Sequence, residues 1–200
     1  ISLDKYTTLV MVSGSYNQLR DSDIEKIKDW VGKGNTLITI ARGSSWAINK
    51  KIVDETLVKG KKDTVFSRKN YVDARENIGR ERIGGVILSV DLDLTHPLAF
   101  GYNDLSIPVY KNNNVFINKT SDHYSSVAIY SEDAHIDGYI SKNNLKNFIP
   151  GSASLLVSRI NSGRVVLFAD NPNFRGSWYG TNKLFLNAIF LGNNIVVPTN

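Results

Sequence analysis

The sequence contains no cysteine. Thiol nucleophiles, disulfides and thiolate metal ligands are therefore all excluded from this chain. The single methionine, Met11, lies inside a predicted strand, and the chain begins at Ile1. We therefore expect this chain to be a segment of a longer protein. No run of residues approaches the roughly 20 apolar positions of a membrane-spanning helix, so the sequence predicts no membrane span.

Histidine is also scarce. The three histidines are His96, His123 and His135, and none has a second metal-ligating residue at helical or strand spacing. The sequence therefore predicts no metal ligand and no cofactor in this segment.

Basic and acidic residues are mixed along the chain. The formal net charge is +5, and basic residues concentrate between Lys50 and Arg82. Acidic residues interrupt that stretch at Asp54, Glu55, Asp63, Asp73, Glu76 and Glu81. This pattern is typical of a solvated, mixed-charge surface, and it predicts no nucleic-acid partner.

The apolar content is sufficient for one folded domain over residues 1–200. Hydrophobic residues make up 42% of the chain, which predicts a sizeable core. Two buried strands alternate with two helices at the start of the chain, at residues 6–13, 22–34, 35–40 and 44–53. Ser22 to Glu25 form a capping-box pattern, and Gly34 suits the end of the first helix. This order favours parallel strands joined by right-handed crossovers.

The remainder of the chain predicts additional strands. Residues 60–85 are polar and weakly periodic, which indicates a long excursion with a flexible loop. Further strands are expected at residues 85–90, 107–110, 115–118, 125–130, 154–160 and 164–169. The asparagines after Lys111 and the turn at 161–163 predict two hairpins. Helices are expected at 141–147, capped by Ser141, and at 179–191.

These elements predict an α/β domain. We expect a mostly parallel sheet that is flanked by helices and extended by antiparallel hairpins.

The loop after the last predicted strand carries five candidate binding residues, Asp170, Asn173, Arg175, Trp178 and Tyr179. In a functional interpretation, Arg175 binds an anion while Trp178 and Tyr179 form a stacking platform. In a structural interpretation, Asp170 and Asn173 bond the loop amides, and Arg175 pairs with Asp170 or another acid. Phe174 and Trp178 then pack under the last helix. The sequence leaves both interpretations open.

The turn after the second strand, Ile40-Ala-Arg-Gly-Ser-Ser45, carries three more candidates, Arg42, Ser44 and Ser45. A strand followed by a helix start is where a nucleophile or an anion site is often found. The turn lacks the residues of a Gly-x-Ser-x-Gly elbow. A catalytic serine and a plain helix cap are the two hypotheses here.

Three motifs resemble one bacterial family. They are VDLDLTHPLAFGY (90–102), DGYISKNNL (137–145) and GRVVLFADNPNFRGSWYGTNKLFLNAIFLG (163–192). They resemble the amidotransferase-like domain at the C-terminus of secreted, Bacteroidetes-type zinc carboxypeptidases, and residues 3–40 are similar to its first strands and helix. The resemblance implies a flavodoxin-like fold of the class I glutamine amidotransferase type.

The resemblance also implies a function. The nucleophilic cysteine of active amidotransferases matches the 40–45 turn, which holds no cysteine, so we expect a catalytically silent accessory domain. Its partner would be an upstream peptidase domain of the same chain, which alone would hold zinc because the His-x-x-Glu pair is absent here. Secreted relatives imply a secreted, periplasmic or cell-surface location. The alternative is an independent hydrolase, or a domain that binds a peptide, small molecule or glycan near Ser44, Ser45 and residues 170–179.

Overall fold

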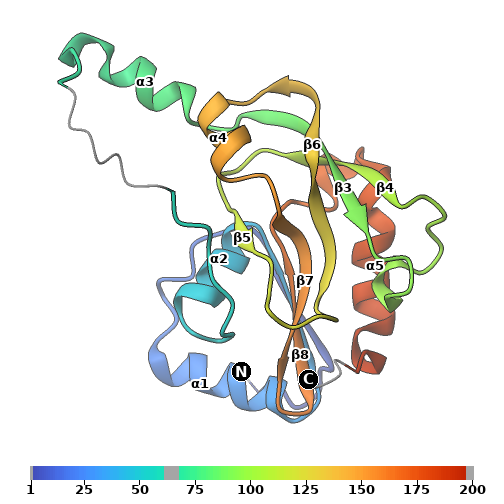
Figure 1. The fold of residues 1–200 in the computed structure, drawn as a ribbon. Helices are drawn as coiled ribbons and strands as arrows, with labels where there is room; N and C mark the ends of the chain where they lie inside the picture. Colours follow the sequence, from blue (N-terminus) through green and yellow to red (C-terminus); the bar gives the residue numbers. More distant parts are fainter. Residues whose placement is uncertain (1, 61–67, 197–200) are drawn as a thin grey trace.

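A mixed β-sheet forms the centre of the protein (Figure 1). The computed structural model describes residues 2–60 and 68–196. Seven strands follow the order β1-β2-β8-β7-β6-β3-β4, and the short β5 pairs with β7. The strands are β1 (Thr8–Met11), β2 (Thr36–Ile40), β3 (Gly85–Leu92), β4 (Ser106–Lys111), β5 (Ile117–Asn118), β6 (Ser126–Tyr139), β7 (Ser152–Ile160) and β8 (Gly163–Phe168).

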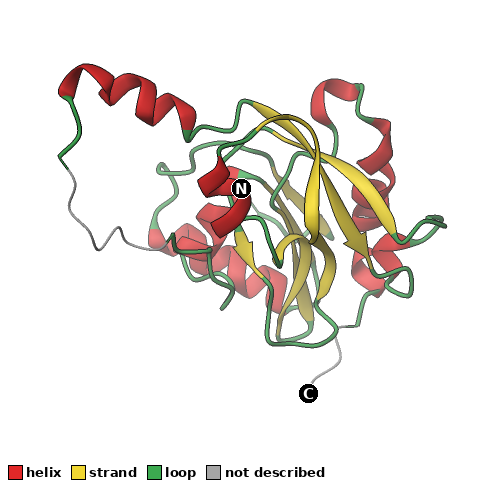
Figure 2. Ribbon diagram, turned by 45° about the horizontal axis from the view of Figure 1, so that its top comes forward, coloured by secondary structure: helices red, strands yellow, loops and turns green. Residues whose placement is uncertain are grey.

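Helices cover both faces of this sheet (Figures 1 and 2). The α-helices of the described residues are α1 (Asp21–Gly32), α2 (Arg42–Asn49), α3 (Ala74–Arg80), α4 (Lys142–Asn147) and α5 (Asn182–Leu191), of which α1, α2 and α5 pack on the sheet. The apolar sides of α1 and α2 pack on one face around Leu37, Val165 and Leu167. The side of α5 that carries Leu184 and Ala188 packs on the other face. Strands β2 and β8 are buried on both faces, and their sequences are mostly apolar, with Thr36, Thr39 and Arg164 as the polar exceptions.

The sheet is less parallel than the sequence predicts. Only β1 with β2 and β2 with β8 pair in parallel. The β3–β4, β3–β6, β5–β7, β6–β7 and β7–β8 pairs are antiparallel. The expectation of a mostly parallel sheet is therefore wrong, whereas the α/β class is confirmed. Only α1 acts as a crossover between neighbouring parallel strands, and tight turns such as the one between β7 and β8 reverse the chain.

One of the two predicted hairpins is confirmed. Residues 161 and 162 connect the antiparallel pair β7–β8, with Asn161 at φ 50°. The predicted pairing of residues 107–110 with 115–118 is wrong, because β4 pairs with β3 while β5 pairs with β7. The asparagine run after Lys111 therefore carries the chain from one part of the sheet to another.

The helix termini follow the predicted chemistry with one shift. Helix α1 begins two residues earlier than the Ser22 pattern predicts, with Arg20 as its N-cap, and Asp23 Oδ2 accepts a hydrogen bond of 3.2 Å from Arg20 N. Gly34 ends this helix region with φ 108°, as expected. The Ser141 cap is confirmed, since Asn144 N donates to Ser141 Oγ at 3.0 Å.

The predicted excursion at 60–85 includes a projecting helix. Residues 61–67 of this segment lie outside the described part of the chain. Residues Tyr71–Asp73 form a 3-10 turn that leads into α3, and Figure 1 shows α3 extending away from the sheet. No helix among the described residues is both long and apolar enough to cross a membrane.

Candidate functional site

The turn between β2 and α2 holds a residue in a sterically unfavourable conformation. Ala41 has φ 50° and ψ −111°, and α2 begins at the next residue. The backbone is held there by its neighbours, since Ala41 N donates to Phe168 O at 2.8 Å and Ser44 N donates to Ala41 O at 3.0 Å. Such a conformation costs about 1–3 kcal/mol in a non-glycine residue. A sharp, strained strand-to-helix turn is the geometry that exposes a nucleophile in hydrolase elbows.

The turn also requires glycine two residues later. A Cβ atom on Gly43 would lie 2.8 Å from Met11 O and 3.0 Å from Val12 O, so β1 approaches the turn too closely for any side chain. Hydrolase elbows likewise carry glycine two residues after the nucleophile. Ala41 and Gly43 therefore reproduce the backbone of a nucleophile elbow, with a methyl group in place of the nucleophile.

The hydroxyl groups of both serines in this turn form hydrogen bonds within the protein. Ser44 is fully buried, and its Oγ donates to Phe168 O at 2.8 Å and lies 2.9 Å from Thr39 Oγ1. Ser44 therefore ties α2 to the sheet rather than capping the helix. Ser45 is partly exposed, and its Oγ donates to Arg42 O at 3.0 Å. The Arg42 side chain points into solvent.

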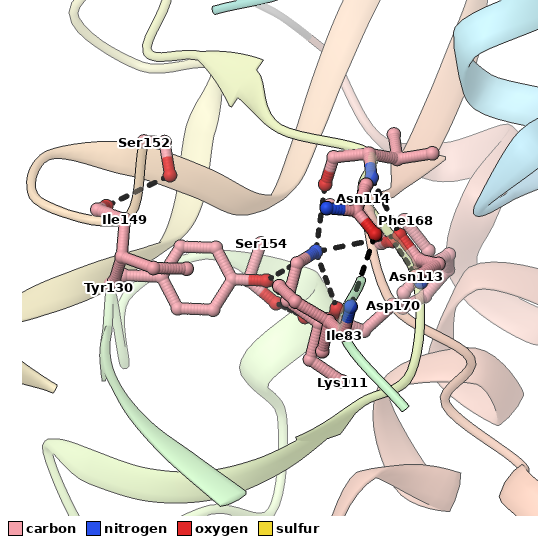
Figure 3. Close-up of polar contacts among 12 residues, drawn as sticks. Ile83, Lys111, Asn113, Asn114, Tyr130, Ile149, Ser152, Ser154, Phe168 and Asp170 are labelled. Carbon is pink, nitrogen blue, oxygen red and sulfur yellow. Dashed lines mark hydrogen bonds and ion pairs between the residues drawn. The ribbon is translucent and has the colours of Figure 1, made fainter. Parts of the chain in front are cut away.

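A buried polar cluster lies at the end of β8, close to this turn (Figure 3). Lys111 Nζ, at the end of β4, lies 3.0 Å from Asp170 Oδ1. The other carboxylate oxygen, Asp170 Oδ2, accepts hydrogen bonds from Tyr130 OH and from Ser154 Oγ, the latter at 2.8 Å. Strands β4, β6, β7 and β8 therefore converge on one ion pair.

The Lys111 ammonium has partners for each of its protons. Besides Asp170, it donates to Val115 O at 2.7 Å and to Tyr130 OH at 3.3 Å. The ammonium also lies 4.9 Å from the centroid of the Phe116 ring, within cation–π range. These contacts supply the hydrogen bonds that a buried charge requires.

Burial shifts the proton affinities in this cluster. It lowers the pKa of the Lys111 ammonium from its usual value, and the Asp170 carboxylate opposes that shift. Burial raises the pKa of the Tyr130 hydroxyl well above its usual value, and the Asp170 carboxylate raises it further. Tyr130 therefore keeps its proton for Asp170. The side-chain exposure is 0% for Lys111 and 7% for Asp170, so the protein encloses this ion pair.

The remaining candidates of the 170s loop lie outside this cluster. Arg175 is exposed, adopts φ 53°, and lies over the Phe174 ring at 5.3 Å from its centroid. Its expected pairing with Asp170 is wrong, because Asp170 pairs with Lys111. Asn173 N donates to Asn171 Oδ1 at 3.0 Å.

The aromatic residues of this loop pack against a strand. The Phe174 and Trp178 rings lie 4.1 Å and 5.9 Å from the Tyr110 ring of β4 between centroids. Both rings therefore pack on β4. Tyr179 is 77% exposed. The structure thus brings Phe174 and Trp178 together and leaves Arg175 and Tyr179 free of this contact.

Two polar groups that the sequence analysis missed hold the buried cluster together, Lys111 and Tyr130. Lys111 was assigned to a hairpin turn. The detectable signal was its spacing, since Ile107, Val109 and Lys111 occupy alternate positions of β4 and are all buried. A lysine at the buried phase of a strand requires an acidic partner, and Asp170 is the partner here.

No metal centre is formed by the described residues. Within residues 2–60 and 68–196, no three His, Cys, Asp or Glu side chains lie close enough to hold an ion. His96 Nδ1 instead accepts from Leu98 N at 3.1 Å, and His135 Nε2 contacts Gly138 O at 2.8 Å.

Solved structures with similar folds include a ThuA-like protein and PurLQS. A ThuA-like protein from Parabacteroides merdae is 11% identical, with a TM-score of 0.59, and the match covers 100% of this chain and 75% of that chain. The structure of PurLQS from Thermotoga maritima matches at 14% identity and a TM-score of 0.54, over 94% of this chain and 80% of that chain.

A cytoplasmic protein from Salmonella typhimurium matches at 14% identity and a TM-score of 0.53, over 94% of this chain and 72% of that chain. No protein family profile and no curated protein matches the sequence. The matches show a fold like that of class I glutamine amidotransferases, which agrees with the resemblance found in the sequence.

Proposed function

We propose that this chain is an accessory domain that has kept the amidotransferase-like fold without acyl-transfer chemistry. One observation carries the proposal. The backbone at Ala41 and Gly43 has the form of a nucleophile elbow, and the side chain at the nucleophile position is a methyl group. A methyl group cannot attack a carbonyl carbon or be activated by a base.

The neighbouring serine does not replace the missing nucleophile. Ser44 is fully buried, and its hydroxyl proton forms a hydrogen bond with the backbone carbonyl of Phe168. Nucleophilic serines need a base within hydrogen-bond reach and an open approach for the substrate. These contacts favour the accessory domain over an independent hydrolase.

We further propose, from the three sequence motifs, that the parent protein is a secreted zinc carboxypeptidase. Zinc and peptide hydrolysis would then belong to the upstream domain, which would also be the partner of this one. Two measurements test this proposal. The full-length product should contain an upstream His-x-x-Glu pair, and it should be recovered from the periplasm, cell surface or medium after signal cleavage. Recovery of an uncleaved protein in the cytosol would contradict it.

An activity assay tests directly whether the turn with Ala41 at the nucleophile position lacks hydrolytic activity. The purified domain should hydrolyse neither glutamine nor p-nitrophenyl acetate above the level of a Ser45→Ala variant. Ser45 is suitable because it is the partly exposed serine of the turn and its hydroxyl bonds only a local carbonyl. Hydrolysis that is lost in Ser45→Ala, without a change in melting temperature, would show that the domain is an enzyme.

A further inference from the structure

A cleft of about 500 Å³ lies beside the segment that leads into β5. Helix α2 contributes Ser45 and Asn49 to the lining, α4 contributes Asn143 and Asn144, and Phe148 follows directly after α4. Figure 1 shows β5 between these two helices. The volume is within the range of small-molecule sites, about 300–1,000 Å³. The cleft includes neither the elbow residue nor the 170s loop.

The floor of the cleft is apolar and partly aromatic. The Phe116 and Phe148 rings lie 4.9 Å apart between centroids, and Val115 lies beside them. Phe116 is buried, whereas Phe148 keeps part of its surface exposed toward the cleft. An exposed ring in a polar cleft offers an apolar face against which a ligand can stack.

Fixed hydrogen-bond acceptors stand above this floor. Glu81 Oε2 accepts from Ser141 Oγ at 2.9 Å and from Asn143 Nδ2 at 3.0 Å, so the carboxylate is held in place. Asn144 Nδ2 donates to Glu81 O at 2.8 Å, which fixes that amide as well. Among the described residues, Glu81 Oε1 and Asn144 Oδ1 accept no hydrogen bond. Glu81 is exposed, so its Oε1 is available to a ligand that donates, whereas Asn144 is buried and serves to hold Glu81 in place.

The charge of the lining restricts the ligand class. Within the described part of the chain no lysine or arginine lines the cleft, and Glu81 is its one charged residue. Phosphates and carboxylates would meet a carboxylate without a compensating cation, which is unfavourable. The cleft instead suits a neutral ligand that has hydroxyl donors on its edges and an apolar face for the Phe148 ring. Neutral sugars combine these properties.

We propose that this cleft binds a neutral sugar residue, with a hydroxyl group donating to Glu81 Oε1 and its apolar face on Phe148. Asn49, which lies exposed at the edge of α2, supplies an amide at the rim. The proposal does not rest on Ala41 and Gly43 or on the carboxypeptidase parent; Ser45 is the one residue of the 40–45 turn that also lines the cleft.

Titration of the 15N-labelled domain with neutral sugars tests this proposal. The probes are glucose, galactose, mannose, N-acetylglucosamine and cellobiose, with glucuronic acid as an anionic comparison. We expect at least one neutral sugar to shift the amide signals of residues 114–116 and 143–148, and glucuronic acid to bind more weakly than glucose. Asn49→Ala and Phe148→Leu should each weaken binding about fivefold to tenfold.

The matched control is Asn194→Ala, an exposed asparagine in the 3-10 turn after α5 and outside the cleft. It should bind as the unmodified domain does. Melting temperatures of all three variants separate lost binding from lost folding. The absence of shifts with every sugar, shifts confined to other parts of the domain, or a preference for glucuronic acid would each overturn the proposal. None of these results would bear on the hydrolysis assay, which tests the elbow alone.

Discussion

Lys111 Nζ and Asp170 Oδ1 lie 3.0 Å apart at a point where four strands of the sheet meet, and both side chains are almost entirely enclosed. The two residues are 59 positions apart in the chain. The lysine ends β4, while the aspartate comes just after β8, so the pair fixes the position of an outer strand relative to a central one.

Removal of either partner should therefore destabilise the fold strongly. Lys111→Met and Asp170→Asn should each lower the free energy of unfolding by about 3–5 kcal/mol, because each leaves the other group buried without its counter-charge. The double variant should lose much less than the sum of the two single losses. Urea unfolding measures all three. As a control, Arg80→Ala removes the exposed pair with Glu76 and should be nearly neutral.

The Tyr130 hydroxyl should make the domain sensitive to alkali. Its folded pKa is raised, so above about pH 10 the unfolded chain loses this proton while the folded chain keeps it. The unfolded state then binds fewer protons, and the free energy of unfolding must fall as the pH rises. Tyr130→Phe removes this contribution. Urea unfolding between pH 9 and 11 should give a shallower decline for the variant, and equal slopes would contradict the assignment.

Substitutions of Arg175 and of Trp178 in the 170s loop should affect stability differently. Arg175 is exposed and adopts φ 53°, so Arg175→Ala should leave the melting temperature nearly unchanged and Arg175→Gly should raise it slightly. Trp178→Ala removes a ring packed on Tyr110 and should cost about 2 kcal/mol. A large loss in Arg175→Ala would show that the guanidinium has a structural partner.

The elbow should tolerate no side chain at Gly43. Gly43→Ala places a methyl group 2.8 Å from Met11 O and should cost about 1–3 kcal/mol, because backbone rather than a flexible side chain must move. Gly79→Ala is the matched control, since a Cβ atom there meets nothing within 4 Å and alanine favours the helix. Thermal unfolding compares the two. Equal melting temperatures would show that the turn can relax.

Local patterns in the sequence were sufficient to predict those elements that depend on residues close together in the chain. The β7–β8 hairpin, the Ser141 cap and the Gly34 helix end each depend on a few adjacent residues. The predicted pairing of β4 with β5 was wrong, because β4 pairs with the preceding strand β3 and β5 pairs with β7, which lies further along the chain. The asparagines at 112–114 are compatible with a tight hairpin, and only the assembled sheet sends β5 to β7 instead.

In the candidate site, too, local features could be predicted from the sequence, whereas contacts between distant residues could not. The strand-to-helix turn expected at 40–45 is present, because strand and helix signals meet there, and Ala41 within it has φ 50°. Asp170 is paired with Lys111 rather than with Arg175. A lysine 59 positions upstream cannot be recognised as that partner until β4 is placed beside β3 and β8 beside β7. Burial of a charge is a property of the assembled sheet.

The distance in the chain between Lys111 and Asp170 also bears on the folding pathway. The pair can close only after strands from both halves of the chain have assembled, and contacts of such long separation form late. An interaction absent from the folding transition state acts on the unfolding rate alone. We therefore expect Lys111→Met to leave the folding rate nearly unchanged in stopped-flow experiments and to accelerate unfolding. The buried ion pair would then determine how long the native protein persists rather than how quickly it forms.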